Sequence, residues 1–241
     1  MAGVLLEVEA IESGYGNKTV LQGVSLRVHE GEVVAVLGHN GAGKSTALKT
    51  ILGLLPARAG SVRFAGERWA NGDPVGNVGR GMALVPQGRG VFPDLTVAEN
   101  LMLGAYTQTR TRRDAAATAA RLREVLELFP VLGERSAQRA GTLSGGQQQM
   151  VAVGMALMPR PRLMMMDEPS IGLAPVLVQR LLEAAREINR RFGTAIILVE
   201  QNIKTALGVA DRAYVMKSGR VVLEKPAAAL LAAKESWWEL Y

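Results

Sequence analysis

Cysteine is absent from this chain of 241 residues. Disulfides, cysteine-based metal sites and thiol nucleophiles are therefore excluded. Uninterrupted apolar runs are short, as at Ala195–Val199, and none approaches the ~18 residues that indicate a membrane span. The segment Met1–Ala10 carries acidic residues and no basic stretch, so it does not look like a secretory signal. We therefore expect a soluble, cytoplasmic protein.

Aromatic residues are also scarce, at 5%, and acidic residues are outnumbered: 28 Lys and Arg against 22 Asp and Glu give a net charge of +6. This charge fits attraction to nucleic acid, attraction to an anionic membrane surface, or a solvated arginine-rich face. The densest basic cluster, Arg110, Arg112 and Arg113, has no interleaved aromatic residues. That composition argues against nucleic acid as a partner.

Hydrophobic residues make up 48% of the chain, enough for a sizeable core. Four nearly continuous apolar segments predict strands buried on both faces of a parallel sheet: Val33–Leu37, Met82–Val85, Leu163–Met166 and Ile196–Val199. Helical patterns follow several of these strands: Lys44–Leu54, Val176–Arg191 and Lys204–Ala210. The alternation predicts an α/β fold, and the length favours a single domain spanning residues 1–241.

Two regions differ from this alternation. Near the N-terminus, Leu5–Ile11 and Val24–Val28 predict antiparallel strands, joined by a turn region at Gly14–Asn17. From about residue 88 to 160 the pattern predicts a helical subdomain inserted into the α/β core. This stretch includes a capping box at Thr96–Glu99 and a long helix over Ala115–Phe129.

A glycine-rich segment, Gly38–Ser45, matches the pattern G-x-x-x-x-G-K-[ST] between a predicted strand and a predicted helix. Its glycines let the backbone curl so that N–H groups face phosphate oxygens, and the helix N-terminus adds partial positive charge. Lys44 would then reach the β- and γ-phosphates, and Ser45 would ligate Mg²⁺. The nucleotide-binding residues predicted here are Gly38, Asn40, Gly41, Ala42, Gly43, Lys44, Ser45 and Thr46.

Two adjacent carboxylates, Asp167 and Glu168, end the apolar segment that begins at Leu163. A buried charge at a strand end is costly unless it is paired or bound to a metal. Taken alone, an acidic pair after a strand is more often an ordinary turn. Downstream of a phosphate-binding loop, Asp167 is expected to hold Mg²⁺ through water while Glu168 polarises the attacking water.

The segment Leu143-Ser-Gly-Gly-Gln147 places a helix-capping serine before two glycines, which makes a second helix terminus suited to anions. These residues resemble the LSGGQ signature of ABC transporter ATPases. The resemblance implies that Ser144, Gly145 and Gly146 contact the γ-phosphate of an ATP held by another subunit, with Gln147 in the same nucleotide-binding group. Two ATP molecules would thereby be enclosed in a head-to-tail dimer.

The resemblance covers essentially the whole chain. It implies an ABC nucleotide-binding domain with a RecA-like core, an N-terminal antiparallel β-subdomain and an inserted helical subdomain. Tyr15 lies where the family stacks an aromatic ring on adenine. Gln87 matches the Q-loop glutamine, which ligates Mg²⁺ and links the nucleotide site to the membrane subunits. The expected metal ligands are thus Ser45, Gln87 and Asp167.

Two positions depart from the commoner ABC pattern, since Ala174 replaces an aspartate and Gln201 replaces a histidine that most members carry. A degenerate, inactive site would explain both changes. However, the segments containing them, Glu168–Pro175 and Leu198–Asn202, resemble the smaller ATPase subunit of branched-chain amino acid uptake systems. The segment Val91–Leu101 resembles the same subunit.

The resemblance therefore implies an ATPase that uses ATP and Mg²⁺ to energise high-affinity uptake of branched-chain or related amino acids and amides. Its catalytic residues would be Lys44, Glu168 and Gln201. Its partners would be a second ATPase subunit, two membrane permease subunits and, indirectly, a periplasmic or lipid-anchored solute-binding protein, with no nucleic acid. It would lie peripherally at the cytoplasmic face of the bacterial inner membrane.

Three alternatives remain open from the residues. The chain could be a nucleic-acid-associated ABC ATPase, although it has neither two tandem ATPase domains nor a long coiled-coil insertion. It could be another P-loop enzyme such as a kinase or GTPase, against which the signature and Gln87 argue. It could also be a non-hydrolysing subunit, which Ala174 and Gln201 favour and Lys44 and Glu168 oppose. The tail at Ser236–Tyr241 could contact a membrane, another subunit or its own domain.

Overall fold

The computed structural model describes residues 3–69, 71–88, 90–106 and 112–233. The tail at Ser236–Tyr241 and Arg110 of the basic cluster lie outside these residues, as do the side chains of Arg112 and Arg113. The predictions made for them therefore stay predictions.

The central sheet has six strands in the order β10-β9-β3-β8-β7-β6. All neighbours pair in parallel except β10, which is antiparallel to β9. The strands are β3 (Val33–Leu37), β6 (Met82–Val85), β7 (Leu163–Asp167), β8 (Ala195–Glu200), β9 (Arg212–Lys217) and β10 (Arg220–Pro226). Because strand ends carry the chemistry in parallel sheets, the carboxyl ends of β3, β7 and β8 fix the position of the site.

Successive residues of the central strands enter two different apolar clusters. In β3, Val33 and Ala35 join the cluster on the side of the helical region, whereas Val34 and Val36 join the cluster under the N-terminal strands. Every residue of β3, β7 and β8 is buried. The prediction of strands covered on both faces is therefore confirmed.

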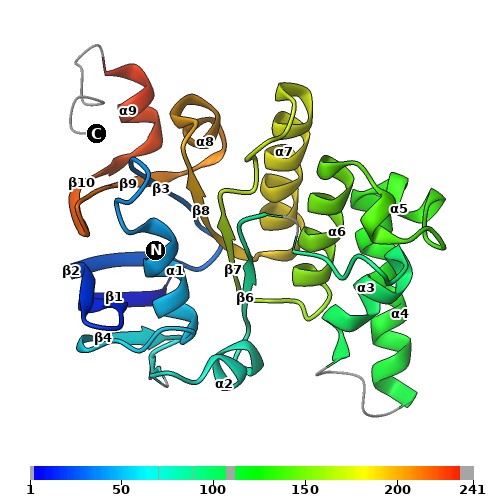
Figure 1. Cartoon of the computed structure of the whole chain (residues 1–241), viewed down its shortest axis with the longest axis horizontal. Coiled ribbons are helices and arrows are strands. Elements are labelled where there is room, and N and C mark those ends of the chain that lie inside the picture. Colours follow the sequence, from blue (N-terminus) through cyan, green and yellow to red (C-terminus); the bar gives the residue numbers. More distant parts are fainter. Residues whose placement is uncertain (1–2, 70, 89, 107–111, 234–241) are drawn as a thin grey trace.

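A second, antiparallel sheet lies at one side of the molecule, in the blue and cyan part of Figure 1, in the order β2-β1-β4-β5. Its strands are β1 (Val4–Tyr15), β2 (Lys18–His29), β4 (Ala59–Phe64) and β5 (Glu67–Arg68). Helix α1 (Lys44–Leu52) packs through Leu48 and Ile51 into the apolar cluster shared by the two sheets. The predicted antiparallel pair is confirmed; β4 and β5 add to it.

The described residues between β6 and β7 form helices gathered at the far end of the molecule from β1 and β2 (Figure 1). They are α3 (Val97–Gly104), α4 (Arg112–Leu128), α5 (Pro130–Glu134), a 3-10 turn (Ala140–Thr142) and α6 (Gly145–Leu157). The capping box predicted at Thr96 and Glu99 is present at the start of α3. The fold is thus an α/β core with an antiparallel sheet and inserted helices; its limits at about 88 and 160 remain a prediction.

The remaining helices are α2 (Pro74–Gly79), α7 (Pro175–Phe192), α8 (Ile203–Val209) and α9 (Ala227–Ala232). Of these, α7 and α8 follow the strands β7 and β8 directly, as the strand-then-helix pattern predicts. Within the described part of the chain, no helix combines the length and apolar character needed to cross a membrane.

Helices α3 and α6 cross at very short range. A methyl group placed on Gly104 would lie 2.2 Å from the backbone carbonyl oxygen of Met155, which no real side chain tolerates. The absence of a side chain at Gly104 is therefore a condition of this crossing, because backbone and not a flexible side chain occupies the space. The crossing sets the position of α3 relative to α6.

A charged network joins the end of β2 to β9 and β10. The Arg212 guanidinium forms two hydrogen bonds to Glu32, from Nε to Oε1 at 2.8 Å and from Nη2 to Oε2 at 3.0 Å, and also pairs with Glu224. Burial alone would raise the pKa of Glu32, but the hydrogen bonds from Arg212 and the His29 backbone outweigh it and lower the pKa below its ordinary value. These ion pairs therefore stabilise the contact of β9 with β10 and with the segment that follows β2.

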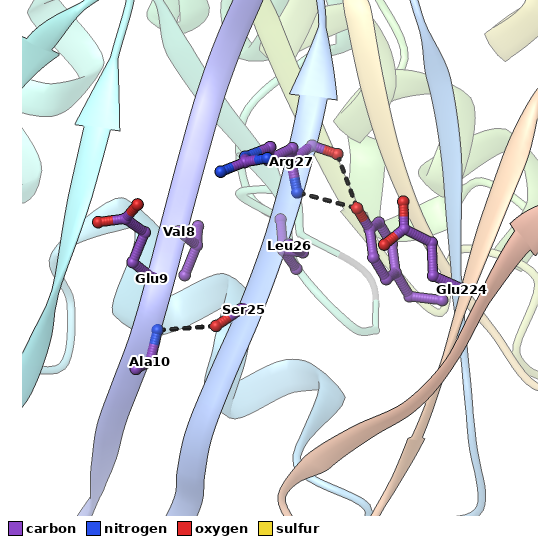
Figure 2. A pocket seen from close by; sticks show the side chains of 8 residues that line it. Val8, Glu9, Ala10, Ser25, Leu26, Arg27 and Glu224 are labelled. Atoms are coloured by element: carbon purple, nitrogen blue, oxygen red, sulfur yellow. Dashed lines mark hydrogen bonds between the residues drawn. The ribbon is translucent and has the colours of Figure 1, made fainter.

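Beside this network lies a cavity of about 450 Å³ between the two sheets (Figure 2). The Tyr214 hydroxyl at its wall accepts a hydrogen bond from the backbone N–H of Arg27 at 3.0 Å. Across the cavity, the backbone N–H of Ala10 donates to the Ser25 hydroxyl at 2.9 Å (Figure 2). None of the residues predicted to bind nucleotide lines it.

Candidate functional site

The predicted phosphate-binding loop connects the carboxyl end of β3 to the first residue of α1, Lys44. A methyl group on Gly38 would lie 2.4 Å from the carbonyl oxygen of Met216, so only glycine lets the loop pass this close to β9. The first turn of α1 contains no acidic residue. No carboxylate within the helix itself therefore offsets the partial positive charge and the N–H groups at its N-terminus, which are suited to an anion.

A cavity of about 340 Å³ opens in front of this loop. Residues from the loop and α1, from the segment after β6, and from the ends of β7 and β8 converge on it. The predicted residues that line it are Asn40, Gly41, Gly43, Lys44, Ser45, Thr46, Gln87, Glu168 and Gln201. Residues more than 150 positions apart in the chain thus meet at one point, as the sequence motifs predict.

Lys44 is buried at the base of this cavity and has three oxygen partners. Its ammonium group donates to the backbone carbonyls of Gly38 at 2.7 Å and His39 at 3.1 Å. It also forms an ion pair with Glu168, at 3.2 Å from Nζ to Oε1, and the two side chains are only 4% and 6% exposed. A cation held at the centre of the loop is suited to binding phosphate oxygens.

Two amide side chains converge on the other oxygen of Glu168. Gln201 donates from Nε2 to Oε2 at 2.6 Å, and Gln87 donates from Nε2 to the same oxygen at 3.1 Å. Glu168 itself has a φ of +47°, a left-handed conformation that is uncommon for a residue other than glycine. Such strained positions cluster at functional sites, where surrounding contacts fix them.

Asp167 is connected to the phosphate-binding loop through Ser45, whose hydroxyl donates to Oδ1 at 2.8 Å. Burial raises the pKa of Asp167, the Ser45 hydrogen bond lowers it, and the negative charge of Glu168 raises it further; the net shift is upward. A buried carboxylate and a hydroxyl at this distance, with the Gln87 amide nearby, form an all-oxygen donor set. Mg²⁺ prefers such ligands and commonly uses one or two carboxylates together with phosphate oxygens and water. The residues present therefore fit a Mg²⁺–nucleotide.

Other predicted residues lie outside the lining of this cavity. Ala42 lines a neighbouring hollow against β9. Tyr15 ends β1 and is 47% exposed. Ser144 caps α6, accepting a hydrogen bond from the backbone N–H of Gln147 and completing a capping box with that residue. The structure thus brings the P-loop and the carboxylates together and places the LSGGQ segment elsewhere on the chain.

Two lining residues carry no motif in the sequence. Val20 of β2 and Ile171, in the segment after β7, contribute apolar walls to the cavity. A single apolar residue in a strand or turn has no periodic or chemical signal of its own, so only the arrangement of the elements identifies it. Ser170 and Glu200, which flank the site, likewise have no sequence signal that points to a role there.

The family model described as "ABC transporter" matches residues 21–171. The chain is 46% identical over 228 residues to the high-affinity branched-chain amino acid transport ATP-binding protein BraG of Pseudomonas aeruginosa, covering 94% of this chain and 95% of that protein. It is 36% identical to a probable branched-chain amino acid transport ATP-binding protein, LivF, of Archaeoglobus fulgidus, covering 94% of each.

A solved structure, a nucleotide-free ATP-binding cassette from an ABC transporter, superposes with a TM-score of 0.84 and 28% identity. The match covers 96% of each chain. The common fold therefore includes nearly the whole chain, with both sheets and the inserted helices.

Proposed function

The chain belongs to the ABC transporter family and is its ATP-binding, ATP-hydrolysing component, and we propose that it energises the import of branched-chain amino acids or related amino acids and amides. The observation that carries the choice of substrate is the 46% identity to the Pseudomonas aeruginosa protein over nearly the full length of both chains. The chain itself would select no solute; that selection belongs to the permease and to a periplasmic or lipid-anchored binding protein.

The residues around the P-loop would hold ATP. On nucleotide binding, Lys44 would exchange the carbonyls of Gly38 and His39 for β- and γ-phosphate oxygens, and the N-terminus of α1 would face the phosphates. Tyr15 would stack on the adenine. Ser45, Gln87 and Asp167 would hold Mg²⁺, which neutralises charge developing on the phosphates during hydrolysis.

Hydrolysis would use Glu168 as the base. Its carboxylate would accept a proton of a water aligned with the γ-phosphate; the water oxygen bonds to phosphorus as the bond to the ADP oxygen breaks. Gln201 and Gln87 already donate to this carboxylate and would keep it oriented. Gln201 would in addition donate to the γ-phosphate in place of the usual histidine.

Two chains would be needed for a complete site. The cap of α6, with Ser144, Gly145, Gly146 and Gln147, lies away from the cavity of its own chain. We expect these residues to close on the γ-phosphate of a second ATPase subunit in a head-to-tail dimer.

The permease subunits would dock on the helical region at about residues 88–160, within a single ABC domain spanning 1–241. Four large apolar side chains are exposed there close together in sequence: Phe92, Met102, Leu103 and Tyr106. Phe92 follows Gln87 by only five residues in the chain, so a partner that binds Phe92 would act close in sequence to the cavity-lining Gln87. The chain would accordingly be a peripheral protein at the cytoplasmic face of the inner membrane.

The test is transport by the assembled system. The chain is co-expressed with permease subunits and a second ATPase subunit of a branched-chain amino acid uptake system, and uptake of labelled leucine, isoleucine, valine and a panel of other amino acids into proteoliposomes is measured. We expect ATP-dependent uptake of branched-chain amino acids, and none with the Glu168→Gln chain. ATP hydrolysis stimulated only by an unrelated solute would contradict the proposed substrate class.

A further inference from the structure

The segment that connects β7 to α7 begins at Glu168, the proposed base. Its first residue is hydrogen-bonded to the neighbouring strand β8. The backbone N–H of Glu168 donates to the carbonyl oxygen of Val199 in β8 at 3.0 Å. At the other end of the segment, Ala174 caps α7 without a side-chain hydrogen bond. The side-chain contacts that hold this segment lie near its start, at Ser170.

Glu200, the last residue of β8, supplies that anchor. It is 2% exposed. Its Oε1 accepts the backbone N–H of Ser170 at 3.1 Å, and its Oε2 accepts the Ser170 hydroxyl at 2.7 Å. The backbone N–H of Gln201 also donates to Oε2, at 3.2 Å. Burial raises the pKa of Glu200, and the bonds from Ser170 and Gln201 oppose this shift.

These contacts form a closed ring. Glu168 is connected along the chain to Ser170, Ser170 donates to Glu200, and Glu200 accepts from the backbone of Gln201. The side chain of Gln201 then returns to Glu168 at 2.6 Å. Displacement of any one member has to move the others, because each contact is short and Glu168 and Glu200 are buried.

We propose that Glu200 and Ser170 are positioning residues for ATP hydrolysis, which fix the Glu168 carboxylate relative to Gln201. Neither residue lines the nucleotide cavity, so neither touches the reacting atoms. Their effect is exerted through geometry: a misplacement of about 1 Å at a reacting group costs about a hundredfold in rate. The inference rests on the ATPase cycle proposed above but not on the solute that is transported.

The decisive variant is Glu200→Gln. An amide has one acceptor oxygen and one donor nitrogen, and Glu200 accepts a backbone N–H on each of its two oxygens. In either amide orientation, one of the two backbone N–H groups therefore faces another donor. We expect kcat to fall about tenfold to a hundredfold, while the Kd for ATP stays within about twofold of the parent because the cavity is unchanged.

Ser170 supplies an independent pair of variants. Ser170→Ala removes only the hydroxyl hydrogen bond and should lower kcat by about three- to tenfold, the usual worth of one such bond. Ser170→Thr keeps the hydroxyl and should restore kcat to near the parent value. The double variant Glu200→Gln/Ser170→Ala should lose less than the product of the two single losses, because both remove members of one ring.

The measurements are phosphate release by the complex with its permease and second ATPase subunit, ATP affinity by calorimetry, and melting temperature. Glu183→Gln is the matched control, since this exposed glutamate on α7 accepts from Gln179 of the same helix and lies outside the ring. If Glu200→Gln does not fold, the comparison of kcat between Ser170→Ala and Ser170→Thr still tests the proposal.

Three results would overturn the proposal: unchanged kcat in Ser170→Ala, equal losses in both Ser170 variants, or a loss of ATP affinity that matches the loss in kcat. Parent activity with an unexpected solute would contradict the proposed substrate and leave this inference standing.

Discussion

The side chain of Gln201 donates a hydrogen bond to Glu168, with Nε2 at 2.6 Å from Oε2. The residue that replaces the usual histidine of this family is thus in direct contact with the proposed base. Because Lys44 occupies the other carboxylate oxygen at 3.2 Å, the orientation of Glu168 is fixed from both sides. The glutamine at this position therefore holds the carboxylate by a hydrogen bond from a neutral donor.

Replacing Gln201 tests whether its side chain acts in ATP hydrolysis. We expect Gln201→Ala to lower kcat by about 10²–10³, which is the worth of one well-aligned donor at a developing charge. Gln201→His should match or exceed the parent, because an imidazole N–H can donate and can also carry charge. Turnover is measured in the assembled complex with Glu168 intact. Unchanged turnover in both variants would show that Gln201 takes no part in hydrolysis.

Loss of Lys44 should weaken ATP binding. Removing a charged hydrogen bond to phosphate costs about 1.5–3 kcal/mol, or tenfold to a hundredfold in affinity. Lys44→Ala should therefore raise the Kd for ATP by that factor in calorimetry. Lys204→Ala, in the exposed part of α8, is the control and should bind as the parent does. Equal affinity in Lys44→Ala and the parent would show that the P-loop assignment is wrong.

Glu168→Gln should bind ATP and fail to hydrolyse it. A positioned base is worth about 10²–10⁴ in rate, so kcat should fall by that amount while affinity is retained. Since closure would no longer be reversed by hydrolysis, ATP should also trap a dimer that gel filtration with light scattering detects. Full ATPase activity of this variant would exclude Glu168 as the base.

The Glu32–Arg212 pair predicts a pH dependence of stability. The pKa of Glu32 is lowered in the folded chain, so the pair contributes fully above the ordinary glutamate pKa and loses its contribution as pH falls through the folded value. Glu32→Gln should therefore lower the free energy of unfolding by about 1–3 kcal/mol near neutral pH. The difference from the parent should shrink as the pH falls below the ordinary glutamate pKa.

Urea denaturation at neutral and at acid pH measures this effect. Glu30→Gln is the control, because the Glu30–Arg162 pair is half-exposed on both sides and should contribute under about 1 kcal/mol. A Glu32→Gln difference that grows toward acid pH would contradict the assigned direction of the shift.

Phe92 tests the proposed permease surface. Its side chain is exposed, while its backbone N–H and carbonyl are both held by the side chain of Asn100. Phe92→Asp should leave the loop and the ATP affinity intact but reduce co-purification with the permease by about tenfold or more, as expected for an aromatic interface anchor. Val75→Asp, at an exposed apolar position on α2, should have no effect.

Much of the fold can be predicted from the sequence, because the core strands give two signals. Each is a nearly continuous apolar run, and several are followed by a helical pattern. The limits predicted at Val33–Leu37 and Met82–Val85 coincide with β3 and β6. Strands with alternating or charged residues were less visible. Among them, β10 (Arg220–Pro226) has no buried residue. The pairing of β9 with β3 gives no signal in the sequence either, because the two strands are far apart along the chain.

At the site, the residues that belong to chemical motifs can be predicted from the sequence. Residues that matter only because the fold brings them to the cavity cannot. Lys44 and Glu168 belong to motifs that rarely occur together outside nucleotide-hydrolysing proteins. Ile171 and Val20 are ordinary apolar residues until the sheet brings them to the cavity. Glu200 was even harder to recognise, because a glutamate at a strand end reads as solvent-exposed; only the structure shows that it is buried and accepts three hydrogen bonds.

The close crossing at Gly104 also bears on how such a chain can diverge. Any side chain at this position would have to displace the backbone of α6, whose first turn is capped by Ser144. A single substitution here therefore cannot retune the tilt of α3 without moving the carboxyl-terminal part of α6 around Met155, and with it the helix that begins at Ser144. If lineages of this protein adapt to different membrane subunits, the changes should accumulate in outward side chains such as Met102 and Leu103, while position 104 stays fixed.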